Sequence, residues 1–304
     1  MKNCRNIPEE AILSGSTLYG TTEWGGPSGW GTVFAVNTDG TGFQTLYSFT
    51  NGVDGGGPEC VLVLSGNTLY GTTSISYYPY RFGNVFALET NGSSFTILHA
   101  FSDSDGVGPS GGLTLSGNTL YGSTTGNTLF AINTDGSAFT TLFSGTVSSL
   151  VVSSVGLILS GDTLYGANVY GGVAGAGSVW AINTNGTGFT TLYSFAATSP
   201  YSVPSGLMLS GNTLYGETAR GGSGGVGTVF SLSLPLPQLA IIQSGTNVVL
   251  SWLANFTGFT VQSTTNLVSP AVWTPVAPAP VVVNGQNTVT NPISGTQQFY
   301  RLQE

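Results

Sequence analysis

The chain has 304 residues, of which 40% are hydrophobic and only 6% are charged. This hydrophobic content is too high for a disordered chain. A formal net charge of -8 with five basic residues leaves no cationic surface for nucleic acid or an anionic membrane. We therefore expect a folded protein with neither partner, and no stretch is long enough to insert into a bilayer.

The first ten residues contain no apolar signal segment. Either the protein is cytoplasmic, or the sequence lacks its true beginning. A composition rich in Ser, Thr, Asn and Gly with almost no lysine favours the second reading, and we expect an extracellular or cell-surface protein. Two cysteines, Cys4 and Cys60, are too few for a disulfide framework or a cysteine metal site, and a bridge between them stays open.

An eight-residue pattern organises the chain. Leu-Ser-Gly-x-Thr-Leu-Tyr-Gly occurs first at residues 13–20 and returns at 64–71, 115–122, 159–166 and 209–216. Its tyrosines are 51, 51, 44 and 50 residues apart. Such a period indicates stacked or radially arranged repeats.

Each repeat reads as four short strands. The first ends at Leu-Ser-Gly, and after a two-residue turn the second carries Thr-Leu-Tyr-Gly, which is a hairpin signal. The third strand is predicted at 32–36, 84–88, 128–132, 178–182 and 228–232. The fourth follows an Asp-Gly or Asn-Gly turn and is predicted at 43–49, 95–101, 139–143 and 189–195.

Neighbouring residues in these strands are both apolar, as in Leu18 with Tyr19, so both faces of each sheet must be covered. Four-stranded antiparallel sheets covered on both faces and repeated about every fifty residues predict an all-β fold, a five-bladed β-propeller. We expect this domain at residues 1–234, with repeats at about 11–49, 61–101, 112–143, 156–195 and 206–232.

The fifth repeat ends after its third strand, so its blade is predicted to be incomplete. Because Pro8 precedes Leu13 as Pro204 precedes Leu209, the sequence begins within a connection between two repeats. We interpret it as a truncated product or fragment whose complete form starts with a signal peptide and the missing strand. How the ring closes without that strand is left open.

Antiparallel pairing places the long connections of every repeat at one end of the sheets. They span residues 21–31, 72–83, 167–177 and 217–227 between second and third strands, and 50–58, 102–109, 144–155 and 196–204 between repeats. Loops on a rigid scaffold usually carry recognition, so this loop face is the favoured binding surface.

The first repeat carries a recognisable set of residues: Leu18-Tyr19-Gly20-Thr21-Thr22, Gly25-Gly26, Gly31 to Phe34, Asp39-Gly40, Phe43, Leu46 and Phe49. This set resembles the GloVer tandem repeat of choice-of-anchor bacterial surface proteins, and it is distantly similar to kelch-type blades. The resemblance covers about residues 8–232 in five copies. It implies a secreted or anchored propeller with no established ligand. The third repeat departs from the pattern, because its connection shrinks to residues 123–127.

Residues 235–237 form a proline-containing linker, and residues 238–304 have a different pattern. This stretch resembles a small fibronectin-type-III-like β-sandwich, in which Trp252 and Trp273 are the expected core residues. Its strands are predicted at 239–243, 247–252, 258–263, 272–276, 287–290 and 298–302. We interpret it as a spacer or attachment module.

Several residues that could bind a ligand or a metal are interpreted as structural. One tyrosine per repeat at a fixed strand position is what packing between blades demands, so we prefer packing to a sugar-stacking ring. His99 takes the position of Tyr47 and Tyr193 and is interpreted as an aromatic replacement. Asp103 and Asp105 are interpreted as turn residues rather than Ca²⁺ ligands. We expect no metal, no cofactor and no catalytic residue.

One enzymatic alternative depends on paired carboxylates. Closing a ring of five blades would bring Glu217 near Glu23 on the loop face, and two acids at short range are what glycoside hydrolysis needs. Their positions in the repeat differ by two residues. A carbohydrate-active enzyme, a glycoside hydrolase or lyase, is therefore the alternative function.

The connections predicted for the loop face contain aromatic residues that we expect to be exposed. The candidate ligand-binding residues are Trp24, Trp30, Tyr77, Tyr78, Tyr80, Arg81 and Tyr170. Such rings could stack on a sugar or contact a protein. The alternative is structural: the rings fold over the tops of the blades and fill gaps there. The predicted function is a non-enzymatic exported protein that binds an extracellular glycan or surface protein. A structural surface component without a discrete ligand is the second alternative.

Overall fold

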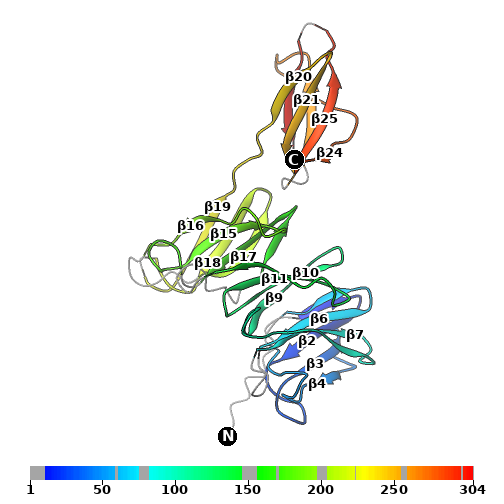
Figure 1. Cartoon of the computed structure of the whole chain (residues 1–304), viewed down its shortest axis with the longest axis vertical. Coiled ribbons are helices and arrows are strands. Elements are labelled where there is room, and N and C mark those ends of the chain that lie inside the picture. Colours follow the sequence, from blue (N-terminus) through cyan, green and yellow to red (C-terminus); the bar gives the residue numbers. More distant parts are fainter. Residues whose placement is uncertain are drawn as a thin grey trace. The chain divides into compact units, whose positions relative to one another are not determined.

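The computed structural model describes residues 11–58, 61–74, 82–145, 156–168, 171–196, 204–222, 224–254, 259–295 and 297–303. These residues form strands and no helix, so none of them belongs to a helical membrane span. The chain divides into two compact units (Figure 1). One unit holds residues 1–159, 164–210 and 214–232, and the other holds 160–163, 211–213 and 233–304. We call residues 1–232 the repeat region and residues 233–304 the C-terminal module.

The repeat region contains five antiparallel sheets in chain order. Sheet 1 is β1 (Ala11–Ser14), β2 (Thr17–Thr22), β3 (Thr32–Asn37) and β4 (Gln44–Ser48). Sheet 2 is β5 (Val63–Ser65), β6 (Thr68–Thr73), β7 (Asn84–Glu89) and β8 (Phe95–Ala100). Sheet 3 is β9 (Pro109–Ser116), β10 (Thr119–Thr124), β11 (Thr128–Asn133) and β12 (Thr140–Ser144).

Sheet 4 is β13 (Ile158–Ser160), β14 (Thr163–Asn168), β15 (Ser178–Asn183) and β16 (Thr190–Ser194). Sheet 5 has three strands, β17 (Pro204–Ser210), β18 (Thr213–Thr218) and β19 (Thr228–Ser233), with β19 at its edge. The all-β class and the repeated antiparallel sheets are therefore confirmed.

The repeated octet forms the first hairpin of each sheet. In sheet 1, Leu13 pairs with Leu18, and Gly15 makes the turn with a φ of +60°, which favours glycine. The pairing of third and fourth strands shifts register at one recurring place, immediately after Val33, Val85, Leu129 and Val179. A bulge at a fixed position increases the local twist of each sheet in the same way.

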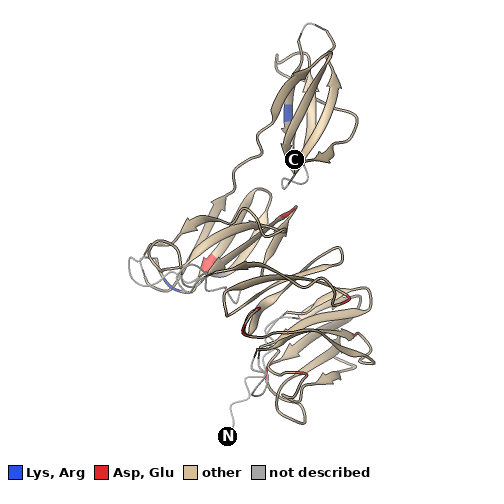
Figure 2. Ribbon diagram, in the orientation of Figure 1, with Lys and Arg blue, Asp and Glu red and all other residues tan. Residues whose placement is uncertain are grey.

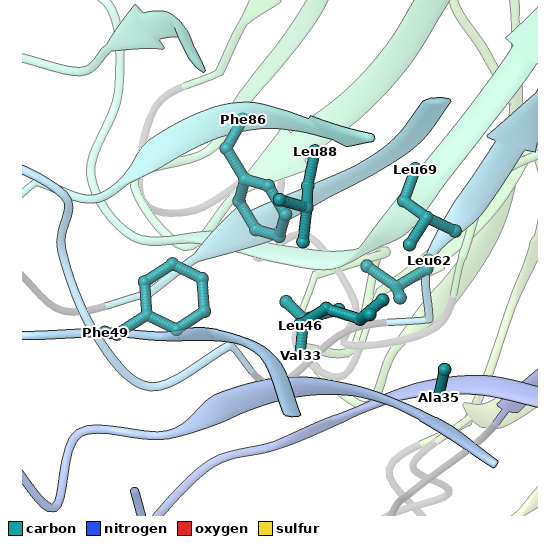
Figure 3. Close-up of a cluster of buried hydrophobic side chains, with 8 residues drawn as sticks. All are labelled: Val33, Ala35, Leu46, Phe49, Leu62, Leu69, Phe86 and Leu88. Carbon is teal, nitrogen blue, oxygen red and sulfur yellow. The ribbon is translucent and has the colours of Figure 1, made fainter. Parts of the chain in front are cut away.

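Each sheet has two apolar faces, which we name by the neighbour that each one meets. The forward face packs on the next sheet, and the rear face packs on the preceding sheet. The cluster between sheets 1 and 2 joins Val33, Ala35, Leu46 and Phe49 of sheet 1 to Leu62, Leu69, Phe86 and Leu88 of sheet 2 (Figure 3).

The same arrangement recurs along the repeat region. Sheets 2 and 3 share a cluster of Tyr70, Val85, Phe101, Leu113, Leu120, Phe130 and Ile132. Sheets 3 and 4 share a cluster of Tyr121, Leu129, Ala131, Leu157, Leu164, Trp180 and Ile182. In the octet, the tyrosine therefore belongs to the forward face and the preceding leucine to the rear face. The described tyrosines of these clusters serve packing between sheets, as the sequence predicts.

The glycine after each repeated tyrosine makes room for an aromatic ring. Gly20 pairs across the sheet with Phe34, and Gly71 with Phe86. A Cβ atom on Gly71 would lie 2.6 Å from Cζ of Phe86, which is closer than real atoms approach. The ring therefore covers the glycine of the neighbouring strand, and this pairing explains why the octet ends in glycine.

The two ends of the sheet series are uncovered. On the rear face of sheet 1, Leu13 is 61% exposed, and on the forward face of sheet 5, Val229 is 83% exposed. A closed ring would bury both residues. The five sheets are therefore present, whereas their closure into a propeller ring is not confirmed.

The C-terminal module contains two sheets. One has the order β20 (Ala240–Ser244), β21 (Asn247–Leu253), β25 (Gln286–Pro292) and β24 (Val281–Val283). The other has the order β23 (Thr274–Pro275), β22 (Thr260–Thr264) and β26 (Phe299–Gln303). Trp252 is buried with Leu250, Val261 and Val289 in a core that draws on both sheets, as predicted.

Trp273 does not belong to that core, and this prediction was wrong. Its ring is only partly buried, and the guanidinium carbon of Arg301 lies 4.4 Å from the ring centroid. A cation over a ring face is favourable at a solvent-exposed position. Strand β24 was missed altogether, because its three valines are exposed and give no alternating pattern.

Candidate functional site

Two of the predicted ligand-binding residues are described, and they contact each other. Trp24 and Trp30 lie in the connection between β2 and β3, with ring centroids 5.8 Å apart and planes tilted by 42°. The connection folds back on itself because Gly31 N donates to Gly25 O at 3.0 Å. Trp24 is 41% exposed, so the pair presents one indole to solvent.

Trp30 is the anchor of this pair. It packs against the cluster between sheets 1 and 2. Its carbonyl oxygen accepts a hydrogen bond from Gly57 N at 3.0 Å, and a Cβ atom on Gly56 would lie 3.1 Å from Trp30 Cβ. Trp30 thus belongs to the structural interior of the loop, whereas Trp24 offers a supported and exposed ring.

The other candidate binding residues cannot be placed beside this pair. Tyr77, Tyr78, Tyr80, Arg81 and Tyr170 lie outside the described residues. Cys4 and Cys60 lie outside them too. The aromatic loop surface therefore stays a prediction beyond Trp24 and Trp30.

The candidate carboxylates lie on different sheets. Glu23 is half-buried just after β2, and Glu217 is exposed on β18. Their predicted meeting requires the forward face of sheet 5 to cover the rear face of sheet 1, but Val229 on that forward face is exposed. Charged residues are scattered along the described ribbon (Figure 2). Within the described ranges, no three His, Cys, Asp or Glu side chains gather as a metal site.

A buried carboxylate organises the connection between sheets 1 and 2. Asp54 accepts hydrogen bonds from Thr50 N at 2.8 Å, Thr50 Oγ1 at 2.6 Å, Gly52 N at 3.1 Å and the Tyr47 hydroxyl at 3.2 Å. Burial, followed by the charge of Asp54 and its hydrogen bond, raises the pKa of Tyr47 to about 12. The phenol therefore remains a donor, and the carboxylate is fully used in fixing the loop.

In the connection between sheets 2 and 3, another aspartate accepts a similar set of hydrogen bonds from different residues. Asp105 Oδ1 accepts from Ser102 N at 2.6 Å and Ser102 Oγ at 2.9 Å, while its Oδ2 lies 2.8 Å from His99 Nε2. Burial alone would raise the pKa of Asp105, but the hydrogen bonds from Ser102 and His99 together lower it. The interpretation of Asp105 as a turn residue is confirmed.

Sequence reasoning missed the link between these loops and the strands before them. His99 and Tyr47 occupy the same repeat position, and each meets the carboxylate of the following connection. The ring of His99 also stacks on Phe139 at 3.6 Å, as its interpretation as an aromatic replacement requires. The sequence signal for this link was a Thr or Ser after the fourth strand that is followed by an Asp, as in Thr50 with Asp54 and Ser102 with Asp105.

The comparisons with known proteins support the repeat assignment. Residues 3–144, just under half of the chain, match the family model described as the Gloeobacter/Verrucomicrobia repeat. Among curated proteins, none matches the chain. The tandem-repeat character predicted from the octet is therefore confirmed for this part of the chain.

Solved structures similar to the chain have little sequence in common with it. The computationally designed Ika8 protein is 15% identical with a TM-score of 0.45, over 81% of this chain and 67% of its own. The designed Ika4 protein is 13% identical with a TM-score of 0.38, over 57% and 89%. BamB from Moraxella catarrhalis is 16% identical with a TM-score of 0.41, over 94% and 70%.

Proposed function

We propose that the chain is a non-enzymatic, exported repeat protein that binds an extracellular glycan through its loop face. The observation that carries this proposal is the Trp24–Trp30 pair, in which a partly buried indole packed on the core supports an exposed one. An exposed ring held in place suits stacking on a sugar, since little conformational freedom is lost on binding. The sheets act as a scaffold of propeller type, and residues 238–304 act as a fibronectin-III-like spacer after the linker at 235–237.

We propose a non-enzymatic function because of the contacts and positions of the carboxylates. Asp54 and Asp105 accept hydrogen bonds that fix their own loops. Glu23 and Glu217 lie on sheets 1 and 5, which share no core cluster among the described residues. Export is supported by the scarcity of lysine, and fractionation of the native host tests it.

Glycan-array binding tests the proposed recognition. We expect the purified chain to bind at least one glycan class, and Trp24→Ala to weaken that binding by about tenfold or more, as for a central aromatic contact. Phe43→Ala is the matched control, because Phe43 is also an exposed aromatic residue of sheet 1 but lies on its rear face. Equal losses in both variants, or no glycan bound by the parent chain, would contradict the proposal.

A further inference from the structure

A three-ring stack recurs wherever the fourth strand of one sheet passes the preceding sheet. In sheet 2, Phe95 at the start of β8 lies between two other rings. Its centroid is 5.5 Å from Phe86 on β7 of the same sheet and 4.0 Å from Tyr47 on β4 of sheet 1. The first aromatic residue of the fourth strand thus ties its own sheet to the sheet before it.

Sheets 3 and 4 repeat this stack. Phe139 lies 5.9 Å from Phe130 and 3.6 Å from His99 of sheet 2. In sheet 4, the corresponding ring of Phe189 lies 5.9 Å from Trp180 and 4.6 Å from Phe143 of sheet 3. The middle ring comes from the same repeat position in all three sheets.

Sheet 5 keeps the two outer positions of this stack and lacks the middle one. Phe230 on β19 corresponds to Phe86, and Tyr193 on β16 corresponds to Tyr47. Both residues line a hollow of about 400 Å³, which also reaches Gly222 and Leu232. Tyr193 is 49% exposed as a result.

The remaining walls of the hollow are surfaces that a fourth strand touches elsewhere. A Cβ atom on Gly26 would lie 3.3 Å from Ser48 Oγ, and one on Gly172 would lie 3.0 Å from Ser194 Oγ. Both serines belong to fourth strands. Gly222 is the equivalent glycine of sheet 5, and it borders the hollow.

Strand β19 also has an open edge. The third strands of sheets 1–4 lie between a second and a fourth strand, whereas β19 is the last strand of its sheet. An edge strand presents unpaired amide and carbonyl groups that can pair with an added strand. The open edge and the hollow lie on the same strand, so one extended segment can fill both.

We propose that sheet 5 binds an extended segment of a partner polypeptide as a fourth strand, antiparallel to β19, in the place where the sequence analysis expects a strand of the chain itself. The register of β3 with β4 predicts how it binds, because Thr32 faces Ser48 and Val33 faces Tyr47. The bound segment has the chemistry of the fourth strands of sheets 1, 3 and 4, an uncharged Phe-x-x-Leu-aromatic-Ser sequence; sheet 2 has His99 and Ala100 at the last two positions. Its first aromatic ring enters the hollow between Phe230 and Tyr193. The described fourth strands of a second copy do not supply it, since β4, β8, β12 and β16 are all paired within their own sheets.

A peptide with the sequence of residues 187–196 tests this inference, which does not depend on the proposed glycan binding. We expect the fluorescently labelled peptide to bind the full chain saturably in an anisotropy titration. Replacing the phenylalanine that corresponds to Phe189 by alanine in the peptide should weaken binding by about tenfold or more, because a buried ring is lost. No saturable binding, or equal affinity of the two peptides, overturns the proposal.

A variant of the chain locates the bound peptide. Tyr193→Ala should weaken peptide binding by about tenfold, since it removes one outer ring of the stack, whereas Phe43→Ala on sheet 1 should leave it unchanged. Tyr193 is half-exposed, so this variant is expected to fold. Hydrogen exchange is the second measurement: the peptide should protect the amides of β19. Protection confined to other strands would overturn the proposed position.

Discussion

The interior sheets and the terminal sheet 5 are built from the same repeat but have different surroundings. Val179 on sheet 4 is fully buried, whereas Val229 at the same repeat position on sheet 5 is 83% exposed. Tyr121 is buried in sheet 3, and Tyr215 is 41% exposed in sheet 5. A repeat therefore does not contain a core of its own. It contributes half of each core that it shares with its two neighbours.

The sequence of the last repeat reflects this difference at one position. Where sheets 2, 3 and 4 carry the small residues Thr72, Ser123 and Ala167, all buried, sheet 5 carries Glu217, which is exposed. Burying a carboxylate against the apolar face of another sheet would be costly. The glutamate is compatible with a forward face that meets solvent, as in the capping repeats of other repeat proteins.

The largest expected effect contrasts a covered forward face with the uncovered one. Leu129→Ala in sheet 3 should lower the free energy of unfolding by about 2–5 kcal/mol, because Leu129 is fully buried between two sheets. Val229→Ala, at the same position of sheet 5, should change it by less than about 0.5 kcal/mol. Urea unfolding measures both. Similar losses would mean that the forward face of sheet 5 is covered in solution.

A smaller effect distinguishes two glycines of the octet. Gly71→Ala should cost about 1–3 kcal/mol, because its Cβ atom would lie 2.6 Å from Phe86 and 2.8 Å from Leu62, both confined between sheets. Gly20→Ala should cost less, since the buried ring of Phe34 is stacked on the exposed Phe43, which can move towards solvent. Thermal unfolding compares the two variants, and a larger loss for Gly20→Ala would contradict the difference between interior and terminal sheets.

The smallest effect depends on pH and concerns the connection after sheet 2. Because the folded pKa of Asp105 is lowered, its stabilising contribution is present above its ordinary pKa and is lost as the pH falls through the folded value. Asp105→Asn should therefore lower the free energy of unfolding by about 1 kcal/mol at pH 7, with a smaller difference in acid, as the pH falls through the folded value.

Asp103→Asn in the same connection is the control for this pH series. Asp103 is exposed, and its replacement should have no effect at either pH. A difference between parent and Asp105→Asn that stays constant from pH 7 until the carboxyl is protonated in acid would show that the carboxylate charge is not the stabilising feature.

Much of the architecture could be predicted from the sequence. The octet gives both strands and the turn of the first hairpin, because Gly15 and its equivalents need a left-handed turn that few other residues adopt. Adjacent apolar residues such as Leu18 and Tyr19 indicate two covered faces. These are local signals, repeated five times, and the structure places them on the two faces of each sheet as expected.

The features that escaped prediction depend on contacts between distant segments. Trp30 looks like an exposed loop residue until Gly56 and Gly57 of the following connection pack on it. Tyr193 and Tyr47 are the same residue at the same repeat position, yet the exposure of Tyr193 depends on whether the next sheet has a fourth strand. Neither difference is visible within a single repeat, and for the same reason closure of the ring was not a safe inference from the period alone.

The pairing of a tyrosine-bearing face with a leucine-bearing face has an evolutionary consequence. Duplicating one whole repeat adds both partners of a new interface at once, in the correct order. A gene can therefore gain or lose copies without passing through a protein that lacks a matching contact, and selection can adjust the loops of each copy separately.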